Sequence, residues 1–322
     1  MSDDQAVITE IGGGPWLTLD PPMVLGEAPI FRPSDHTLHW NDCLDTPPEL
    51  HILPLDPATG DAAGPVRTLP LADSVTVQLF RRGRPGSYIC AYYQGVALLD
   101  EATGALEVLR EIIPAGDRAI RRFNDGGVDA AGRFWLAEID VRAMAFGAGS
   151  IPADYAPIGR LWRYDPDGTL TQMESGLVCG NGIGWSPDNK TMYLNDSMAQ
   201  IVWAYDFDLP SGALSNKRIF IDRREAGGEP DGMVIDVEGN LWIAMWGAHS
   251  VMRFDPAGRH TKTITFTAKN MACTTFGGPG YDELYIASAR DRSPTAAADD
   301  DGGQMFRYKA GVRGLPKYEF GG

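Results

Sequence analysis

Six times along the 322-residue chain, a short run of alternating apolar and aromatic residues ends in a turn, usually at an acidic residue. Two of the clearest copies end in Tyr164-Asp165-Pro-Asp-Gly168 and Phe254-Asp255-Pro-Ala-Gly258. Alternation with a period of two is typical of a half-buried strand, and Asp-Pro followed by Gly is hairpin-turn chemistry. This pattern predicts a repeated β structure and leaves little room for long helices.

The copies recur at intervals of about 40 to 65 residues, which is close to the length of one blade of a β-propeller. We mark each copy by the residue at which its strand enters the turn. These residues are Asp56, Asp100, Asp165, Asp206, Asp255 and, in a sixth copy that lacks the acidic residue, Tyr308. Six copies predict an all-β, six-bladed β-propeller that spans residues 1–322 as one domain. Many short strands joined by turns also suit a chain with 38 glycines and 23 prolines.

Three segments fall outside the repeat. The longest interval holds residues 144–157, which lack strand alternation and predict an insertion loop at about 143–158; such loops are often lids or binding loops. A polar stretch at about 293–303 predicts a flexible surface loop. We expect the segment before Met23 to supply an outer strand against the last blade, because an unclosed ring exposes two strand edges.

Charge and composition narrow the choice of partners. The formal net charge of −15 argues against nucleic acid or an anionic membrane, because both require clustered Lys and Arg. The start Met1-Ser-Asp-Asp-Gln-Ala6 lacks the features of a secretory signal, and no run of about 18 apolar residues is present. We expect a soluble cytoplasmic protein, a monomer or small homo-oligomer, that acts on a small molecule.

Four polar residues share one position in the repeat. Each precedes, by 11 or 12 residues, a ring-bearing residue of the following strand: Glu27 precedes His39, Asn124 precedes Trp135, Asn181 precedes Tyr193 and Asp231 precedes Trp242. The first strand of each blade lies nearest the propeller axis, so equivalent positions are expected to point into one central cavity. The corresponding places in the second and sixth blades fall near Thr76 and at 273–274, which are uncharged.

Two carboxylates and two amides form an oxygen-rich set that suits calcium, magnesium or manganese. Buried carboxylates repel one another, and a cation is the natural way to hold them together. The alternative is that Asn-Gly and Asp-Gly pairs are ordinary turn residues, but random turns would not select one register. Other hydrolase patterns are missing from the sequence: it has no HExxH and no Gly-x-Ser-x-Gly, and its four cysteines are far apart and expected to be buried thiols.

The segments that carry these residues resemble the SMP-30/gluconolactonase/regucalcin-like family. They are, in order, Gly26-Glu27-Ala28-Pro29, Arg122-Phe-Asn124-Asp125-Gly126, Gly180-Asn181-Gly182 with Asn195-Asp196-Ser197, and Pro230-Asp231-Gly232. That family consists of six-bladed propellers with a divalent metal in the central channel, and many members hydrolyse sugar lactones. The resemblance therefore implies one divalent ion, calcium first, with zinc, manganese, magnesium or iron as alternatives.

The resemblance also implies roles for single residues. Glu27, Asn181 and Asp231 become metal ligands, and Arg122 and Asn124 become substrate contacts. Asp196 follows an inner strand near the same cavity, and it is a candidate to contact and orient the metal ligands without binding the metal itself. One departure concerns the acidic residue that family members commonly carry shortly after the third inner strand: here residues 137–142 run into the insertion, so we expect a remodelled substrate pocket.

These roles predict hydrolysis of a small sugar lactone to the open-chain aldonic acid. A metal held by three protein oxygens has room for a water and for the lactone carbonyl, which it polarises. Asp231 is the candidate general base, and Arg122 or Asn124 would stabilise the developing oxyanion or orient hydroxyls. Two alternatives remain: an ester or organophosphate hydrolase using the same metal, and a non-catalytic propeller whose metal is structural or sensory.

Overall fold

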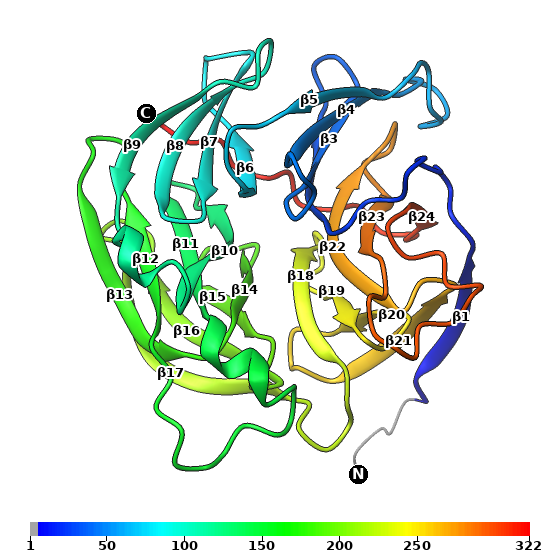
Figure 1. Ribbon diagram of the computed structural model, residues 1–322. Helices are drawn as coiled ribbons and strands as arrows, with labels where there is room; N and C mark the ends of the chain where they lie inside the picture. Colours follow the sequence, from blue (N-terminus) through cyan, green and yellow to red (C-terminus); the bar gives the residue numbers. More distant parts are fainter. Residues whose placement is uncertain (1–5) are drawn as a thin grey trace.

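Six β-sheets stand around a central axis in the computed structural model, which describes residues 6–322 (Figure 1). The inner strands of neighbouring sheets contact one another all the way round the ring. The prediction of an all-β, six-bladed β-propeller is confirmed. Residues 1–5, on which part of the argument against a secretory signal rests, lie outside the described residues. Within residues 6–322, no helix is both long enough and apolar enough to cross a membrane.

Each blade starts at the axis and runs outward, with neighbouring strands antiparallel. Blade 1 comprises β2 (Gly26–Arg32), β3 (Thr37–Asp42), β4 (Glu49–Pro54) and β5 (Arg67–Pro70); blade 2 comprises β6 (Val75–Phe80), β7 (Ser87–Tyr92), β8 (Gly95–Asp100) and β9 (Leu106–Glu111); blade 3 comprises β10 (Arg121–Val128), β11 (Phe134–Asp140), β12 (Gly159–Tyr164) and β13 (Leu170–Leu177).

The second half of the ring follows the same plan. Blade 4 comprises β14 (Gly180–Trp185), β15 (Thr191–Asp196), β16 (Ile201–Asp208) and β17 (Ala213–Asp222); blade 5 comprises β18 (Glu229–Ile235), β19 (Leu241–Trp246), β20 (Ser250–Phe254) and β21 (His260–Phe266); blade 6 comprises β22 (Asn270–Gly277), β23 (Glu283–Ala289) and β24 (Met305–Lys309). The six markers predicted from the repeat all fall in, or within two residues after, the third strand of a blade. Two 3-10 helices, η1 (Ala115–Asp117) and η2 (Val141–Ala145), lie in connections.

The N-terminal segment closes the ring in a way that differs from the prediction. Its strand β1 (Ile8–Gly13) pairs in parallel with β21, so it extends blade 5. A short bridge reaches the last blade, where the amides of Trp16 and Leu17 donate to the carbonyl of Met305 at 2.9 and 3.1 Å. Blade 6 has three strands, and the chain covers the outer edge of β24 on its way from blade 5 to blade 1.

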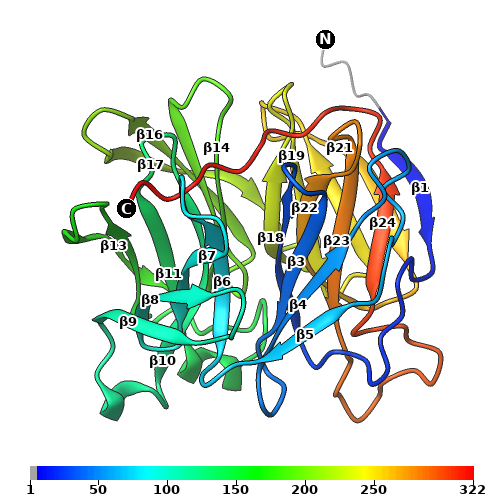
Figure 2. The same ribbon diagram turned by 90° about the horizontal axis from the view of Figure 1, so that it is seen from above.

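The C-terminal segment crosses the face of the propeller where the inner hairpins turn (Figure 2). Leu315 donates its amide to the carbonyl of Ile235 at 3.0 Å in blade 5. Farther on, Phe320 pairs with blade 2 through the carbonyl of Phe80 at 2.9 Å, and Gly321 donates to Gly132 of blade 3 at 3.0 Å. One short tail therefore ties three blades together and covers this end of the channel.

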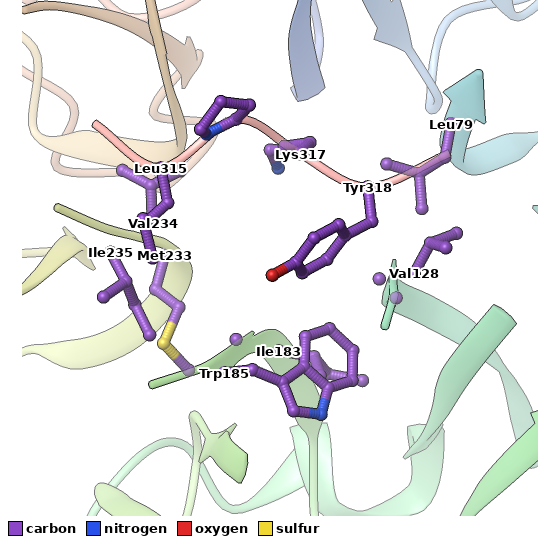
Figure 3. A pocket seen from close by; sticks show the side chains of 14 residues that line it. Leu79, Val128, Ile183, Trp185, Met233, Val234, Ile235, Leu315, Lys317 and Tyr318 are labelled. Atoms are coloured by element: carbon purple, nitrogen blue, oxygen red, sulfur yellow. The ribbon is translucent and has the colours of Figure 1, made fainter. Parts of the chain in front are cut away.

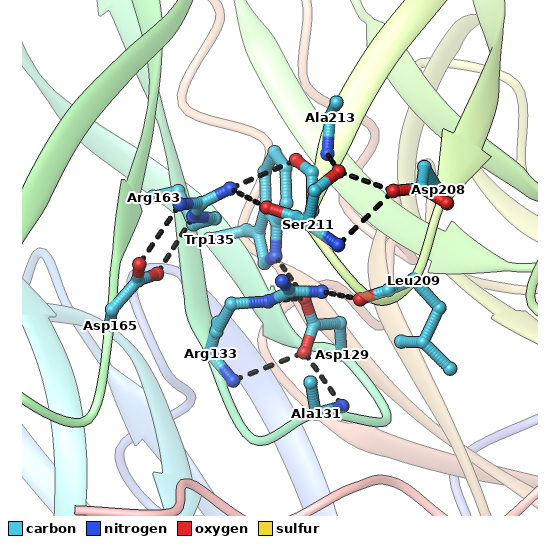
Figure 4. Close-up of polar contacts among 11 residues, drawn as sticks. Asp129, Ala131, Arg133, Trp135, Arg163, Asp165, Asp208, Leu209, Ser211 and Ala213 are labelled. Atoms are coloured by element: carbon cyan, nitrogen blue, oxygen red, sulfur yellow. Dashed lines mark hydrogen bonds and ion pairs between the residues drawn. The ribbon is translucent and has the colours of Figure 1, made fainter.

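Buried aspartates at the first turns of blades 3 and 5 hold the core tryptophans. Trp135 donates its indole nitrogen to Asp129 at 2.8 Å, and Trp242 makes the same bond to Asp236 at 2.9 Å. Asp129 also accepts from Arg133 Nε at 2.7 Å (Figure 4). Trp135, Trp185 and Trp242 are buried in the blades, and Trp203 is half-buried. All four cysteines are buried free thiols, as predicted.

Candidate active site

The inner strands carry a β-bulge near their start, and the predicted site residues lie at these bulges. The ladder skips residues between Glu27 and Ile30 in β2, Phe123 and Gly126 in β10, Gly180 and Ile183 in β14, and Pro230 and Met233 in β18. A bulge bends its strand and re-aims the side chain that loses its partner. Each of the four polar residues lies three positions before the one that pairs with the ring-bearing residue, so the equivalence predicted from the spacing is confirmed.

Glycines beside the ligand candidates allow the inner strands to meet near the axis. A Cβ atom on Gly182 would lie 2.7 Å from the carbonyl oxygen of Asp231 on the next inner strand. A Cβ on Gly232 would collide with the sulfur of Cys273 on the strand after that. Any side chain at either position would push neighbouring blades apart. The Asn-Gly and Asp-Gly pairs are therefore needed for close packing of inner strands, which the turn interpretation does not explain.

A cavity of about 270 Å³ brings five predicted residues together at one end of the channel. They are Glu27, Arg122, Asn124, Asn181 and Asp231. The insertion lines the same cavity through Met144, Gly147 and Ala148, which is consistent with the binding-loop interpretation. Asp196 does not line it.

Burial and charge make the cavity a place for a cation. Burial raises the pKa of Glu27 to about 8, with a further contribution from the nearby Asp125 carboxylate. Burial, and then Glu27 itself, raises the pKa of Asp231 well above its usual range. The Asp231 Oδ1 atom is buried and has no hydrogen-bond partner in residues 6–322. Carboxylates held together in this way fit a bound cation.

The donor set is mixed. Among residues 6–322, no cluster of three or more His, Cys, Asp or Glu side chains is positioned to hold a metal ion, so an amide must complete the two carboxylates. Asn181 could supply this amide: its Nδ2 donates to Ser197 Oγ at 3.0 Å, which leaves the amide oxygen as the remaining acceptor. Ser197 in turn donates to the carbonyl of Pro230 at 2.7 Å. Oxygen ligands of this kind suit hard divalent cations.

Arg122 and Asn124 reach the cavity from β10 in blade 3. The Arg122 guanidinium lies over the Tyr93 ring, 4.8 Å from its centroid, and its buried Nη1 has no partner among the described residues. Asn124 donates its Nδ2 to the carbonyl of Gly180 at 3.1 Å, which leaves its oxygen as an acceptor. A free cationic donor and a free amide acceptor can bind a carbonyl and a hydroxyl of the same molecule.

Asp196 belongs to a set of aspartates that end the second strand of a blade. Its carboxylate accepts from the amides of Val178 at 3.2 Å and Cys179 at 2.8 Å, just before β14. Asp42 makes the equivalent bonds to Val24 at 2.7 Å and Leu25 at 3.0 Å, just before β2. Both therefore fix the start of an inner strand that carries a ligand candidate, and Asp196 acts through the backbone.

The equivalent aspartate of blade 3, Asp140, holds the insertion. It accepts from Arg142 Nε at 2.9 Å, from the Tyr155 hydroxyl at 2.8 Å and from the amide of Ile158 at 3.1 Å. Its neighbour Glu138 is fully buried and pairs with Arg160 at 2.7 Å. Of residues 137–142 only Ile139 lines the cavity, so this segment presents an apolar side chain there. The remodelled substrate pocket stays a prediction.

Sequence reasoning missed several lining residues. Glu229, Trp246, Ser197 and Met198 all face the cavity from blades 4 and 5. A signal existed for Glu229, because residues two apart on a strand point to the same side and Glu229 lies two before Asp231. Burial raises the pKa of Glu229 to about 7.

A second, smaller cavity of about 70 Å³ lies at the other end of the channel, beneath the C-terminal segment. Figure 3 shows Tyr318 of this segment reaching toward Trp185, with Met233 and Val128 on the walls. Lys317 opposes the rise in pKa that burial imposes on Asp125. The C-terminal segment covers this end of the channel, whereas the insertion lines the cavity at the other end.

A propeller whose inner strands gather carboxylates, amides and an arginine in one axial cavity defines a class of protein, and sequence comparison identifies the same class. The profile of the family described as SMP-30/Gluconolactonase/LRE-like region matches residues 25–290. The chain belongs to this family, as the motifs predicted.

Individual proteins of known class are also similar to this chain. The chain is 30% identical to the pentonolactonase XacC of Haloferax volcanii over 308 residues, covering 91% of this chain and 94% of that protein. It is 32% identical to regucalcin of Danio rerio over 244 residues, covering 74% and 78%. Among solved structures, a calcium-binding regucalcin from Agrobacterium tumefaciens superposes with a TM-score of 0.84 at 26% identity, covering 98% and 99%.

Proposed function

We propose that this protein is a divalent-metal-dependent lactonase that hydrolyses a small sugar lactone to the open-chain aldonic acid. One observation carries the proposal: a single cavity holds an unpartnered Asp231 oxygen, a second carboxylate, and the free Arg122 and Asn124 groups. An ion with only a structural role would need neither Arg122 nor Asn124 beside it. The 30% identity to a pentonolactonase over nearly the whole chain supports the choice of substrate class.

Glu27, Asn181 and Asp231 would hold the metal. When bound, a divalent cation supplies Lewis-acid polarisation of the lactone carbonyl and lowers the pKa of a water. Asp231 takes a proton from the attacking water at its free Oδ1 and passes it to the ring oxygen as the carbon–oxygen bond of the lactone breaks. Arg122 Nη1 donates to the carbonyl oxygen as negative charge develops there, and Asn124 Oδ1 accepts from a hydroxyl of the ring.

The second candidate is a propeller that binds a metal without catalysis, which the similarity to the calcium-binding regucalcin of Agrobacterium tumefaciens favours. A pH-indicator assay separates the candidates. It would compare aldonolactones with a phenyl ester and a phosphotriester, each after chelation and after addition of calcium, magnesium, manganese or zinc. The proposal expects lactone turnover that chelator removes and metal restores. Turnover of the phosphotriester alone would favour the organophosphate alternative, and no turnover with any metal would favour the second candidate.

A further inference from the structure

Glu229 is a carboxylate in the cavity that the proposed chemistry does not use. It lies at the start of β18 and lines the cavity together with Asp231, two residues farther along the same strand. Within residues 6–322, the side chain of Glu229 has no hydrogen bond and no ion pair, in contrast to Glu138 and Asp140 of blade 3. An acceptor that faces a cavity without a protein partner is available to a ligand.

The position of Glu229 is fixed by the fold. Its backbone pairs with Trp246 of β19, so it is part of the sheet. The preceding Gly227 and Gly228 have φ of 71° and 75°, a conformation that turns the chain sharply into the strand. Gln200 of blade 4 donates its side-chain amide to the carbonyl of Gly228 at 3.3 Å. The carboxylate is therefore presented from a strand, and binding a ligand need not order a loop.

The wall contributed by Ile139 and by the insertion has the opposite character, although Arg122 and Asn124 of blade 3 also line the cavity. Ile139 and Met144 line it, and Met198 of blade 4 adjoins them. None of these side chains can accept a hydrogen bond from a hydroxyl at full strength. A hydroxyl group of a ligand that lies against this wall finds no strong acceptor there, whereas one on the blade 5 side meets the carboxyl group of Glu229.

We propose that Glu229 accepts a hydrogen bond from a hydroxyl of the substrate and thereby selects polyhydroxylated lactones over lactones without hydroxyl groups. This inference rests on the proposed lactonase function. It assigns Glu229 to substrate recognition and leaves the metal to Glu27, Asn181 and Asp231.

The test compares Glu229→Ala and Glu229→Gln with wild type on two lactones of equal ring size, one an aldonolactone and one unsubstituted. Hydrogen bonds to charged groups correspond to about 10- to 100-fold in binding, so Glu229→Ala should lower the ratio of kcat/KM between the two lactones by about that factor, mainly through KM. Glu229→Gln keeps an acceptor oxygen and should lose less. Glu225→Ala is the matched control, because Glu225 is exposed in the loop before β18.

Other results would overturn the assignment. Equal losses on both lactones would make Glu229 part of the reaction machinery, and weaker calcium binding in calorimetry would make it a metal ligand. An unchanged ratio would leave it without a role in recognition. If wild type hydrolyses neither lactone, the proposed function fails but Glu229 is still testable through quenching of Trp246, which lines the cavity. Tighter binding of the hydroxylated lactone that Glu229→Ala removes would support the inference, and no preference in wild type would refute it.

Discussion

Asn181 and Ser197 are joined by a 3.0 Å hydrogen bond from the side-chain amide to the hydroxyl oxygen, across the first two strands of blade 4. Because Ser197 also donates to the carbonyl of Pro230, the same hydroxyl links Asn181 to the strand that carries Asp231. Two of the three proposed ligands are therefore oriented by one serine that was not predicted from the sequence. Partners of this kind commonly set metal affinity as strongly as the ligands do.

Replacing Ser197 with Ala should weaken metal binding by about 10-fold, because the Asn181 amide loses the acceptor that orients it. Isothermal titration of the chelated protein with calcium measures the change. Ser250→Ala is the control, since Ser250 is also buried and its hydroxyl has no partner among residues 6–322. Equal affinities in the two variants would show that Ser197 does not orient the ligand.

Replacing Glu27 with Gln should affect the metal-free and metal-loaded protein in opposite ways. Without metal, the folded protein holds Glu27 protonated at pH 7, since its pKa is about 8, whereas the unfolded chain ionises it. Gln removes the cost of taking up this proton and should raise the free energy of unfolding by about 1–3 kcal/mol at pH 7. With metal, the stabilisation that the ion adds to wild type should be lost. Thermal unfolding with and without chelator gives both numbers.

Glu138→Gln is the informative comparison for Glu27→Gln. Glu138 is equally a buried carboxylate, but it is paired with Arg160 at 2.7 Å. Its replacement should destabilise the protein by about 1–3 kcal/mol and leave the metal response intact. If both variants were destabilised in chelator, the raised pKa inferred for Glu27 would be wrong.

Two buried histidines predict loss of stability in acid. Burial lowers the pKa of His39 to about 3 and that of His51 to about 4. Below the unfolded value of about 6.5, the unfolded chain binds protons that the folded chain refuses. Their contribution is therefore complete above about pH 6.5 and declines as the pH falls toward 4, by up to about 1.4 kcal/mol per pH unit for each histidine.

Urea unfolding at several pH values between 4 and 7 measures this decline. His51→Asn should flatten the slope, whereas His249→Asn should not, because His249 is exposed and its φ of 53° is a conformation that Asn tolerates. Identical slopes in wild type and His51→Asn would contradict the prediction.

The insertion should lose its order when Asp140 is replaced by Ala. Asp140 fixes the start of the insertion through Arg142 and its end through Tyr155 and Ile158. We expect faster protease cleavage within residues 141–158 and a KM for lactone raised about 10-fold, because one to two net hydrogen bonds no longer hold the cavity wall. Tyr155→Phe removes a single bond and should show a smaller effect. No change in cleavage or KM would mean that other contacts hold the loop.

The fold was predictable because its evidence is local and repeated. Each third strand ends in its own turn residues, and Trp135 and Trp242 recur at one place in their blades. The ring closure was predicted less well, since nothing in residues 8–13 distinguishes the edge of blade 5 from that of blade 6. The C-terminal cover over the channel has no sequence signal, because it depends on long-range contacts such as Leu315 to Ile235.

The sequence predicted which residues of the inner strands form the site, but it did not predict the other residues that line the cavity. Spacing found Glu27, Asn124, Asn181 and Asp231 because the bulges repeat with the blades. Ser197 enters the cavity through the way neighbouring blades pack, which a single strand does not encode. Glu229 lies two residues before Asp231 on β18, so its place was within reach of the sequence pattern. The metal roles, the location in the cell and the oligomeric state stay predictions.

The most direct measurement of the central claim is lactone hydrolysis by Asp231→Asn with wild type beside it. Asn keeps the size of the side chain but cannot accept the proton and carries no charge for the metal. We predict that kcat falls by at least about 100-fold, because a general base typically contributes a rate factor of this size. The variant should still unfold cooperatively. Turnover equal to that of wild type, with both proteins loaded with the same divalent metal, would contradict both the metal site and the base assigned to Asp231.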